Sequence, residues 1–158
     1  MRLTVYTDYS LRLLIYAALA PNRLINITEV AQAYSISRNH LTKVVHQLAL
    51  AGYLITVRGK GGGLRLAVRP EAIRLGDVVR ECEPDTALVP CFSPIDAPCA
   101  IRTRCVLRQA LHEARDEFFK VLDGYTLADL VAPGDGLRTL LALPRSRRKE
   151  SRLVYRSS

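Results

Sequence analysis

The sequence predicts a mainly α-helical protein with one small β-hairpin, and three observations support this fold class. Three segments of helical periodicity follow one another before Gly52, each closed by a turn or a helix-ending residue. An alternating segment and a run of glycines come next, and a longer helical segment begins near Arg104. The order of three helices and a hairpin is that of a winged helix-turn-helix, a fold that binds DNA.

The first two predicted helices precede the turn of this motif. The first runs from Thr7 to Ala20, with apolar residues three and four positions apart, and Pro21 ends it. The second runs from Thr28 to Tyr34, and the hydroxyl of Thr28 is expected to cap the free amides at its start. A tight turn at Ser35 to Ser37 then leads into the third helix.

The third predicted helix carries polar residues that we expect to face DNA. Ser37 is positioned to cap it, and Gly52 follows it as a C-terminal glycine should. The candidate DNA contacts are Ser37, Arg38, Asn39, His40, Thr42, Lys43 and Gln47. The start of this helix lies against base edges in such a motif, so Arg38 to His40 suit direct readout and the later residues suit phosphates. The alternative is a merely solvated face of an amphipathic helix.

The hairpin adds positive charge to this surface. Alternation from Tyr53 to Arg58 predicts one strand, and Leu64 to Val68 predicts its partner. The tip between them contains Lys60 and the triple glycine Gly61 to Gly63, so we expect it to be flexible. Arg58 and Lys60 are therefore candidates for contacts with a minor groove or phosphates. A nucleotide-binding glycine loop is excluded, because it would join a strand to a helix.

Charge is distributed unevenly along the chain, whose net charge is +8. Residues 1–80 contain eleven Lys and Arg against four Asp and Glu, whereas residues 81–143 contain six against ten. The tail from Pro144 contains six against one, and we expect it to be mobile. Counterion release from phosphates favours local positive charge, so the N-terminal half is the candidate for binding double-stranded DNA. A solvated basic face is the alternative.

The second half combines an irregular loop with a long helix. A short helix from Ile73 to Glu81 precedes a loop that contains four prolines between Pro84 and Pro98. The long helix has an apolar seam at Leu107, Leu111, Ala114, Phe118 and Val121. This spacing suits either an intrachain core or pairing with the same helix of a second copy, and we favour a homodimer because few other long helices could cover it. A last short helix runs from Thr126 to Leu130.

The compartment decides how the four cysteines are interpreted. The apolar run from Leu13 to Ala20 is far shorter than the roughly 20 residues that a bilayer requires, and no signal peptide precedes it. We therefore expect a cytoplasmic protein without a membrane partner. Cysteines in that compartment are kept reduced, so clustered ones indicate metal chemistry before disulfide chemistry.

Cys91, Cys99 and Cys105 form such a cluster, separated by seven and five residues. A closed zinc site needs a fourth Cys or His, and the paired CXXC spacing is absent, so structural zinc is the alternative. An iron-sulfur cluster with three thiolates and one oxygen or nitrogen ligand fits the count better, although spacing alone does not choose the metal. An electron carrier or enzyme would not need the basic winged helix, and no carboxylate pair or Cys-His dyad indicates catalysis.

Several stretches together resemble the Rrf-type winged-helix regulators and, within that family, its nitric-oxide-sensing repressors. They are LTVYTDYSLRLLIY, SISRNHLTKVVHQLALAGYL, VRGKGGGLRLA, IRLGDVVRECEP, the cysteine loop and YTLADL, and they cover residues 1 to about 131. The resemblance implies a homodimer on palindromic promoter DNA, with paired long helices. It further implies that nitric oxide attacks the cluster, weakens DNA binding and relieves repression of nitrosative-stress genes. A regulator that responds to another redox stimulus is the alternative.

The resemblance also implies a ligand set. Cys91, Cys99 and Cys105 would hold the cluster, which we expect to be 4Fe-4S, with 2Fe-2S as the other form. The non-cysteine ligand would be an acidic residue from the first helix of the partner subunit, which matches Asp8, with Arg12 nearby. The alternative for Asp8 is a carboxylate stabilised by the free amides of the helix start.

Two further residues refine the assignment. Cys82 lies outside the motif, where the family commonly has an apolar residue, and is interpreted as a buried thiol. Arg108 occupies the position at which the cluster-biogenesis regulators of the family have a His ligand, which argues against that branch. The expected organisation is a DNA-binding domain at 1–70, a cluster loop and dimerisation helix at 71–131, and a basic tail at 132–158.

Overall fold

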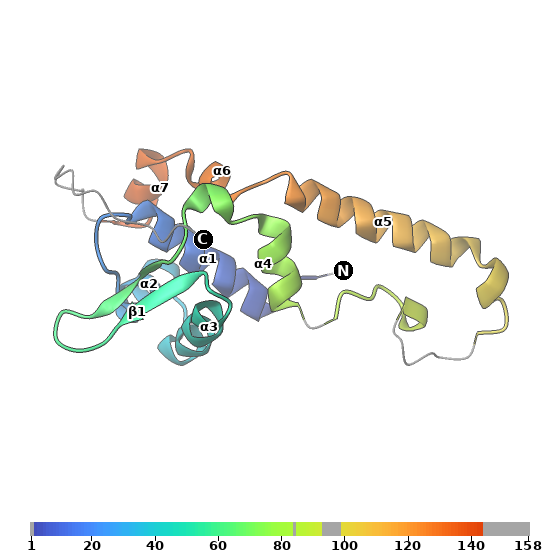
Figure 1. The fold of residues 1–158 in the computed structure, drawn as a ribbon, viewed down its shortest axis with the longest axis horizontal. Coiled ribbons are helices and arrows are strands. Elements are labelled where there is room, and N and C mark those ends of the chain that lie inside the picture. Colours follow the sequence, from blue (N-terminus) through green and yellow to red (C-terminus); the bar gives the residue numbers. More distant parts are fainter. Residues whose placement is uncertain (1, 84, 93–98, 144–158) are drawn as a thin grey trace.

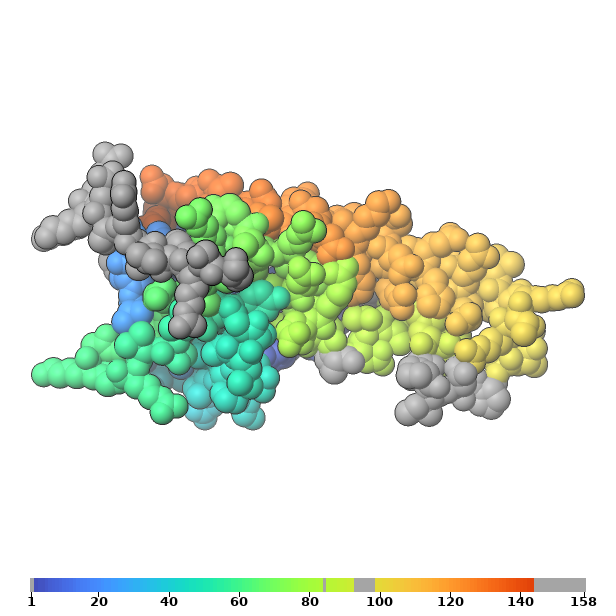
Figure 2. Space-filling model, viewed as in Figure 1, coloured from blue at the N-terminus to red at the C-terminus, as the bar shows by residue number. Residues whose placement is uncertain are grey.

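A long helix, α5 (Val106–Asp123), extends from a body of shorter helices and a two-stranded hairpin (Figure 1). The computed structural model describes residues 2–83, 85–92 and 99–143. These residues are mostly helical and contain one antiparallel hairpin, which confirms the fold class. In the space-filling view, the tip of the hairpin and the beginning of α5 project at opposite ends of the molecule (Figure 2). Of the tail predicted at 132–158, residues 144–158 lie outside the described ranges, whereas residues 132–143 are described.

Helix α1 (Val5–Leu19) runs through the centre of the body, with Leu13 and Leu14 fully buried. It begins earlier than the expected Thr7, because the hydroxyl of Thr4 accepts a hydrogen bond from the backbone N–H of Thr7 at 3.2 Å. The helix therefore begins at Val5, the residue that follows the capping threonine.

Helices α2 (Ile27–Tyr34) and α3 (Arg38–Leu50) form the helix-turn-helix. The expected cap at Thr28 is wrong, since Asn26 and Glu29 form a reciprocal capping box that starts α2. The turn is confirmed, with Ser35 in the left-handed conformation. The inner face of α3 carries three buried apolar side chains at helical spacing, namely Leu41, Val44 and Leu48.

The strands β1 (Leu54–Val57) and β2 (Gly63–Leu66) pair antiparallel, with Leu54 opposite Leu66. Backbone hydrogen bonds of 2.8 and 2.9 Å between Ile25 and Leu64 join this wing to the connection before α2. A Cβ on Gly63 would lie 2.5 Å from the carbonyl oxygen of Ile25. Part of the glycine run is therefore required by close backbone packing, and not only by flexibility at the tip.

The remaining elements return the chain to the body. Helix α4 (Leu75–Cys82) packs beside α5, and α6 (Leu127–Val131) packs against α1. Short 3-10 turns occur at Pro70–Ala72, Pro90–Phe92 and Arg102–Arg104. A further helix, α7 (Asp135–Leu140), was not predicted, because the segment contains Pro133, Gly134 and Gly136. Within the described residues, no helix is long and apolar enough to cross a bilayer.

Candidate DNA interface and cysteine site

The start of α3 and the wing tip present the predicted DNA contacts to solvent. All eight proposed residues are exposed, namely Ser37, Arg38, Asn39, His40, Thr42, Lys43, Arg58 and Lys60. Ser37 occupies the cap position, but the expected capping hydrogen bond from its side chain is absent. The hydroxyl of Thr42 donates to the carbonyl oxygen of Arg38 at 2.9 Å within the helix. The exposed side chains define a polar, cationic surface on the element that a helix-turn-helix inserts into a major groove.

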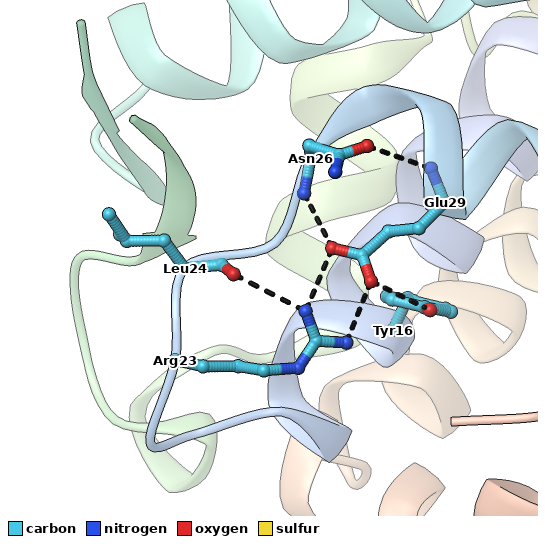
Figure 3. A network of polar contacts seen from close by, with 5 residues as sticks. All are labelled: Tyr16, Arg23, Leu24, Asn26 and Glu29. Atoms are coloured by element: carbon cyan, nitrogen blue, oxygen red, sulfur yellow. Dashed lines mark hydrogen bonds and ion pairs between the residues drawn. The ribbon is translucent and has the colours of Figure 1, made fainter. Parts of the chain in front are cut away.

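A polar network fixes the helix that braces α3 (Figure 3). Arg23 donates two hydrogen bonds of 2.8 Å to the carboxylate of Glu29, which also accepts from the backbone N–H of Asn26 at 2.6 Å. The hydroxyl of Tyr16 on α1 reaches the same carboxylate at 3.4 Å. Burial opposes ionisation of Glu29, yet the hydrogen bonds from Arg23 and Asn26 hold its pKa below the ordinary value. Sequence reasoning missed this network, although Asn26 and Glu29 have capping-box spacing.

Asp8 lies on the first turns of α1 with 46% of its side chain exposed. Its carboxylate accepts a hydrogen bond from Nε of Arg12 at 2.9 Å. The guanidinium of Arg12 lies 5.7 Å from the ring centre of Tyr34 on α2, and the ring of neighbouring Tyr9 lies 6.1 Å from that of His40 on α3. Burial raises the pKa of Tyr34 to about 12, although the charge of Arg12 opposes this. The turn that carries Asp8 therefore contacts both helices of the DNA-binding motif.

The three loop cysteines are free thiols around the beginning of α5. Cys91 is half-buried in a short turn, Cys99 is exposed, and Cys105 occupies the cap position of α5. Among the described residues, no three His, Cys, Asp or Glu side chains converge to hold a metal. The structure thus places the cysteines on one loop and one helix start without gathering them, and residues 93–98 of that loop lie outside the described part.

Aromatic stacking fixes the Cys91 segment against α5. The ring of Phe92 stacks on that of His112 with 3.8 Å between centres, and the guanidinium of Arg115 lies 5.5 Å from the centre of Phe92. Because Phe92 follows Cys91 directly, these contacts hold one end of the loop to the helix whose start carries Cys105. This anchor was missed, since only the tertiary structure brings the three side chains together.

The donor chemistry around Cys105 fits an anionic iron-sulfur group. The backbone N–H of Arg108 donates to Sγ of Cys105 at 3.4 Å. Nε of Arg108 is buried and has no hydrogen-bond partner within the described residues. Three cysteine sulfurs, together with an arginine Nε that has no acceptor within the described residues, match the ligands and the charge that such a cluster requires.

One face of α5 is left uncovered. No residue of α5 is fully buried, and Leu107 and Val121 of the predicted seam are 66% and 58% exposed. Ala114 is also exposed, whereas Leu111 and Phe118 are half-buried. An intrachain core therefore does not account for the whole seam.

At the junction of α4 and α5, an arginine of α4 pairs with an aspartate at the end of α5, next to a glycine of α4. Arg80 donates hydrogen bonds of 2.8 and 2.7 Å to the two carboxylate oxygens of Asp123, and its guanidinium lies 4.6 Å from the ring centre of Phe119. A Cβ on Gly76 would overlap the carboxylate of Asp123. The Asp123 carboxylate can take this position beside Arg80 because residue 76 has no side chain.

A second carboxylate joins the end of α4 to the start of α1. Glu83 accepts hydrogen bonds from the backbone N–H of Thr4 at 2.7 Å, from the hydroxyl of Thr4 at 3.2 Å, and from the hydroxyl of buried Thr7. We call these contacts the Glu83 clasp. Cys82, the residue before it, is buried as interpreted, and burial raises the pKa of its thiol. The clasp therefore holds the residue at which the cysteine loop begins, after α4, against the start of α1, just before Asp8.

The fold and its exposed surface define a winged helix-turn-helix transcriptional regulator rather than an enzyme. The family model of Rrf2, described as an iron-dependent transcriptional regulator, matches residues 3–133. The chain belongs to the Rrf2 family.

Similar proteins agree with this assignment. The HTH-type transcriptional regulator NsrR of Bacillus subtilis is 48% identical over 144 residues, which cover 90% of this chain and 99% of that protein. NsrR of Geobacillus kaustophilus is 49% identical over 142 residues, with 89% and 97% covered. Among solved structures, CymR, the global cysteine regulator of B. subtilis, has a TM-score of 0.69 at 26% identity, covering 85% of this chain and 99% of its own. IscR of T. potens, at 21% identity and a TM-score of 0.69, shares the fold, with 87% and 91% covered.

Proposed function

We propose that this chain is a homodimeric, cytoplasmic repressor that senses nitric oxide through an iron-sulfur cluster held by Cys91, Cys99 and Cys105. The observation that carries the proposal is the set of three free thiols on the segment that leads into α5, together with Nε of Arg108, which is buried one turn from Cys105 and has no acceptor within the described residues. We propose a 4Fe-4S form over 2Fe-2S, as the resemblance of the sequence to the nitric-oxide-sensing repressors implies. When bound, the cluster would supply the iron at which nitric oxide reacts.

A palindromic promoter is the proposed DNA partner. Arg38, Asn39 and His40 would contact base edges, while Thr42 and Lys43 and the wing residues Arg58 and Lys60 would contact phosphates or the minor groove. In a symmetric dimer the two recognition helices must match half-sites one helical turn apart, about 34 Å, or a multiple of it. The exposed start of α3 and the exposed wing tip support this arrangement.

The dimer is proposed to form through α5. Its exposed apolar seam, including Leu107 and Val121, would be covered by the same helix of a second copy. Within one chain, the beginning of α5 projects away from the body that contains α1 (Figure 1). A ligand from α1 would therefore come from the partner, which agrees with Asp8 as the fourth ligand. We propose 1–70 as the DNA-binding domain and 71–131 as the cluster and dimerisation region.

The residues of α1 would transmit the signal. Asp8 would hold the partner's cluster through the carboxylate that accepts a hydrogen bond from Nε of Arg12 at 2.9 Å, so ligation and the pairing with Arg12 would compete for the same group. Arg12 contacts Tyr34 on α2, and Tyr9 contacts His40 on α3, so a change at this turn reaches the motif directly. A coupling of about 1–3 kcal/mol would change DNA occupancy roughly tenfold or more.

Anaerobic purification tests the cofactor and its fourth ligand together. We expect a brown protein that contains about four irons per chain and shows the absorption and Mössbauer spectra of a 4Fe-4S cluster. Absorption and Mössbauer spectra of Asp8→Ala should differ from those of the wild type, and Asp77→Ala, another exposed carboxylate, should leave them unchanged. Unchanged spectra in Asp8→Ala would remove Asp8 from the ligand set. A colourless, zinc-loaded protein that still binds DNA would favour a constitutive regulator instead.

A further inference from the structure

Arg108 stands apart from the other arginines whose contacts are described. Arg23 and Arg80 each donate paired hydrogen bonds to a carboxylate, and Arg12 and Arg115 each combine a carboxylate with an aromatic ring. Nε of Arg108 is buried and has no acceptor within the described residues. A buried donor of a cationic group without an acceptor is costly, so an acceptor that the described residues do not supply is expected there.

The position of Arg108 indicates what that acceptor is. The residue lies in the first turn of α5, and its backbone N–H already donates to Sγ of Cys105 at 3.4 Å. Its side chain therefore begins one helical turn from a thiol of the cysteine site. Thiolate and sulfide sulfurs carry negative charge and accept hydrogen bonds, and such bonds help to set cluster potentials.

We infer that Arg108 donates a charge-assisted hydrogen bond from Nε to a sulfur of the cluster bound at Cys105, and thereby raises its reduction potential. The inference rests on the proposed cluster. A cation beside the cluster stabilises the reduced state, which carries one more negative charge, more than the oxidised state. Arg108 is thus a tuning residue and not a ligand, and it also stabilises the bound cluster against loss.

The test compares anaerobically reconstituted full-length wild type, Arg108→Gln, Arg108→Lys and Arg104→Gln. Arg104 is the matched control, because it is exposed and adjoins Cys105 on the other side. Midpoint potentials are measured by spectroelectrochemical titration, and cluster loss is followed by absorbance with an iron chelator. We expect Arg108→Gln to lower the midpoint potential by about 59 mV, which makes a one-electron reduction about tenfold less favourable. The same variant should lose its cluster several-fold faster. Arg108→Lys should fall between, and Arg104→Gln should match the wild type.

Apo-protein stability separates tuning from a structural role. Because Nε of Arg108 has no acceptor among the described residues, Arg108→Gln should melt at the wild-type temperature or above it in the apo form. A lower apo melting temperature for both Arg108 variants would overturn the inference, as would potentials equal to those of the wild type. In either case a coloured wild type leaves the proposed function standing. A wild type that binds no iron or sulfide would instead refute both.

Discussion

Removal of the Glu83 clasp should destabilise the apo protein by a measurable amount. Glu83→Ala deletes a carboxylate that accepts hydrogen bonds from Thr4 and Thr7. Among the described residues, the hydroxyl of buried Thr7 is then left with the hydroxyl of Thr4, at 3.0 Å, as its one hydrogen-bond partner. Hydrogen bonds to a charged group contribute about 1.5–3 kcal/mol, and half-exposed ones contribute less, so we expect a loss of about 2 kcal/mol. At this chain length the melting temperature should fall by about 4–8 °C.

The assay is thermal unfolding of the apo protein at one fixed concentration, because dimer stability depends on concentration. Glu81→Ala is the matched control, since Glu81 is an exposed glutamate on the same helix. Its change should stay within about 0.5 kcal/mol. Equal melting temperatures for the two variants would refute the role given to the clasp.

Three further changes test other parts of the structure. Gly76→Ala should separate Asp123 from Arg80, because the new Cβ would overlap the carboxylate. The pKa of Asp123 should therefore rise back toward its ordinary value in an NMR titration, and an unchanged titration would contradict this. Because the pKa of Glu29 is lowered in the folded state, its carboxylate stabilises the fold at pH values above the ordinary pKa of 4.5, and this contribution is lost as the pH falls through the folded pKa. In Glu29→Gln, the melting temperature should therefore fall less steeply on acidification than in the wild type. Leu107→Glu should weaken the dimer at least tenfold by sedimentation, whereas Gln109→Glu on the same exposed helix should not.

Local sequence patterns predicted the helix-turn-helix well, because its residues obey short-range rules. The spacing of Leu41, Val44 and Leu48 predicted the buried face of α3, and the glycine run predicted the wing. The start of α2 was misplaced because a hydroxyl at Thr28 was preferred to the reciprocal pair of Asn26 and Glu29. Such errors shift an element boundary by a residue or two without altering the fold.

The contacts between distant segments could not be predicted from periodicity. Glu83 reaches Thr4 and Thr7 across more than seventy positions, and Arg80 meets Asp123 across 43. The cysteines were recognised by type and spacing, yet the described chain does not gather them. Metal ligands need not converge before the metal binds, because binding and local folding are coupled. The proposed ligand Asp8 adds a second requirement, which is a partner subunit.

Operator affinity before and after nitric oxide tests the central claim most directly. Anaerobic holo-dimer is titrated onto a labelled palindromic operator, selected in vitro with the same protein, and binding is followed by fluorescence anisotropy at constant salt. We predict that nitric oxide weakens binding at least tenfold, corresponding to about 1.4 kcal/mol of coupling. Equal affinity in the two states would contradict the account.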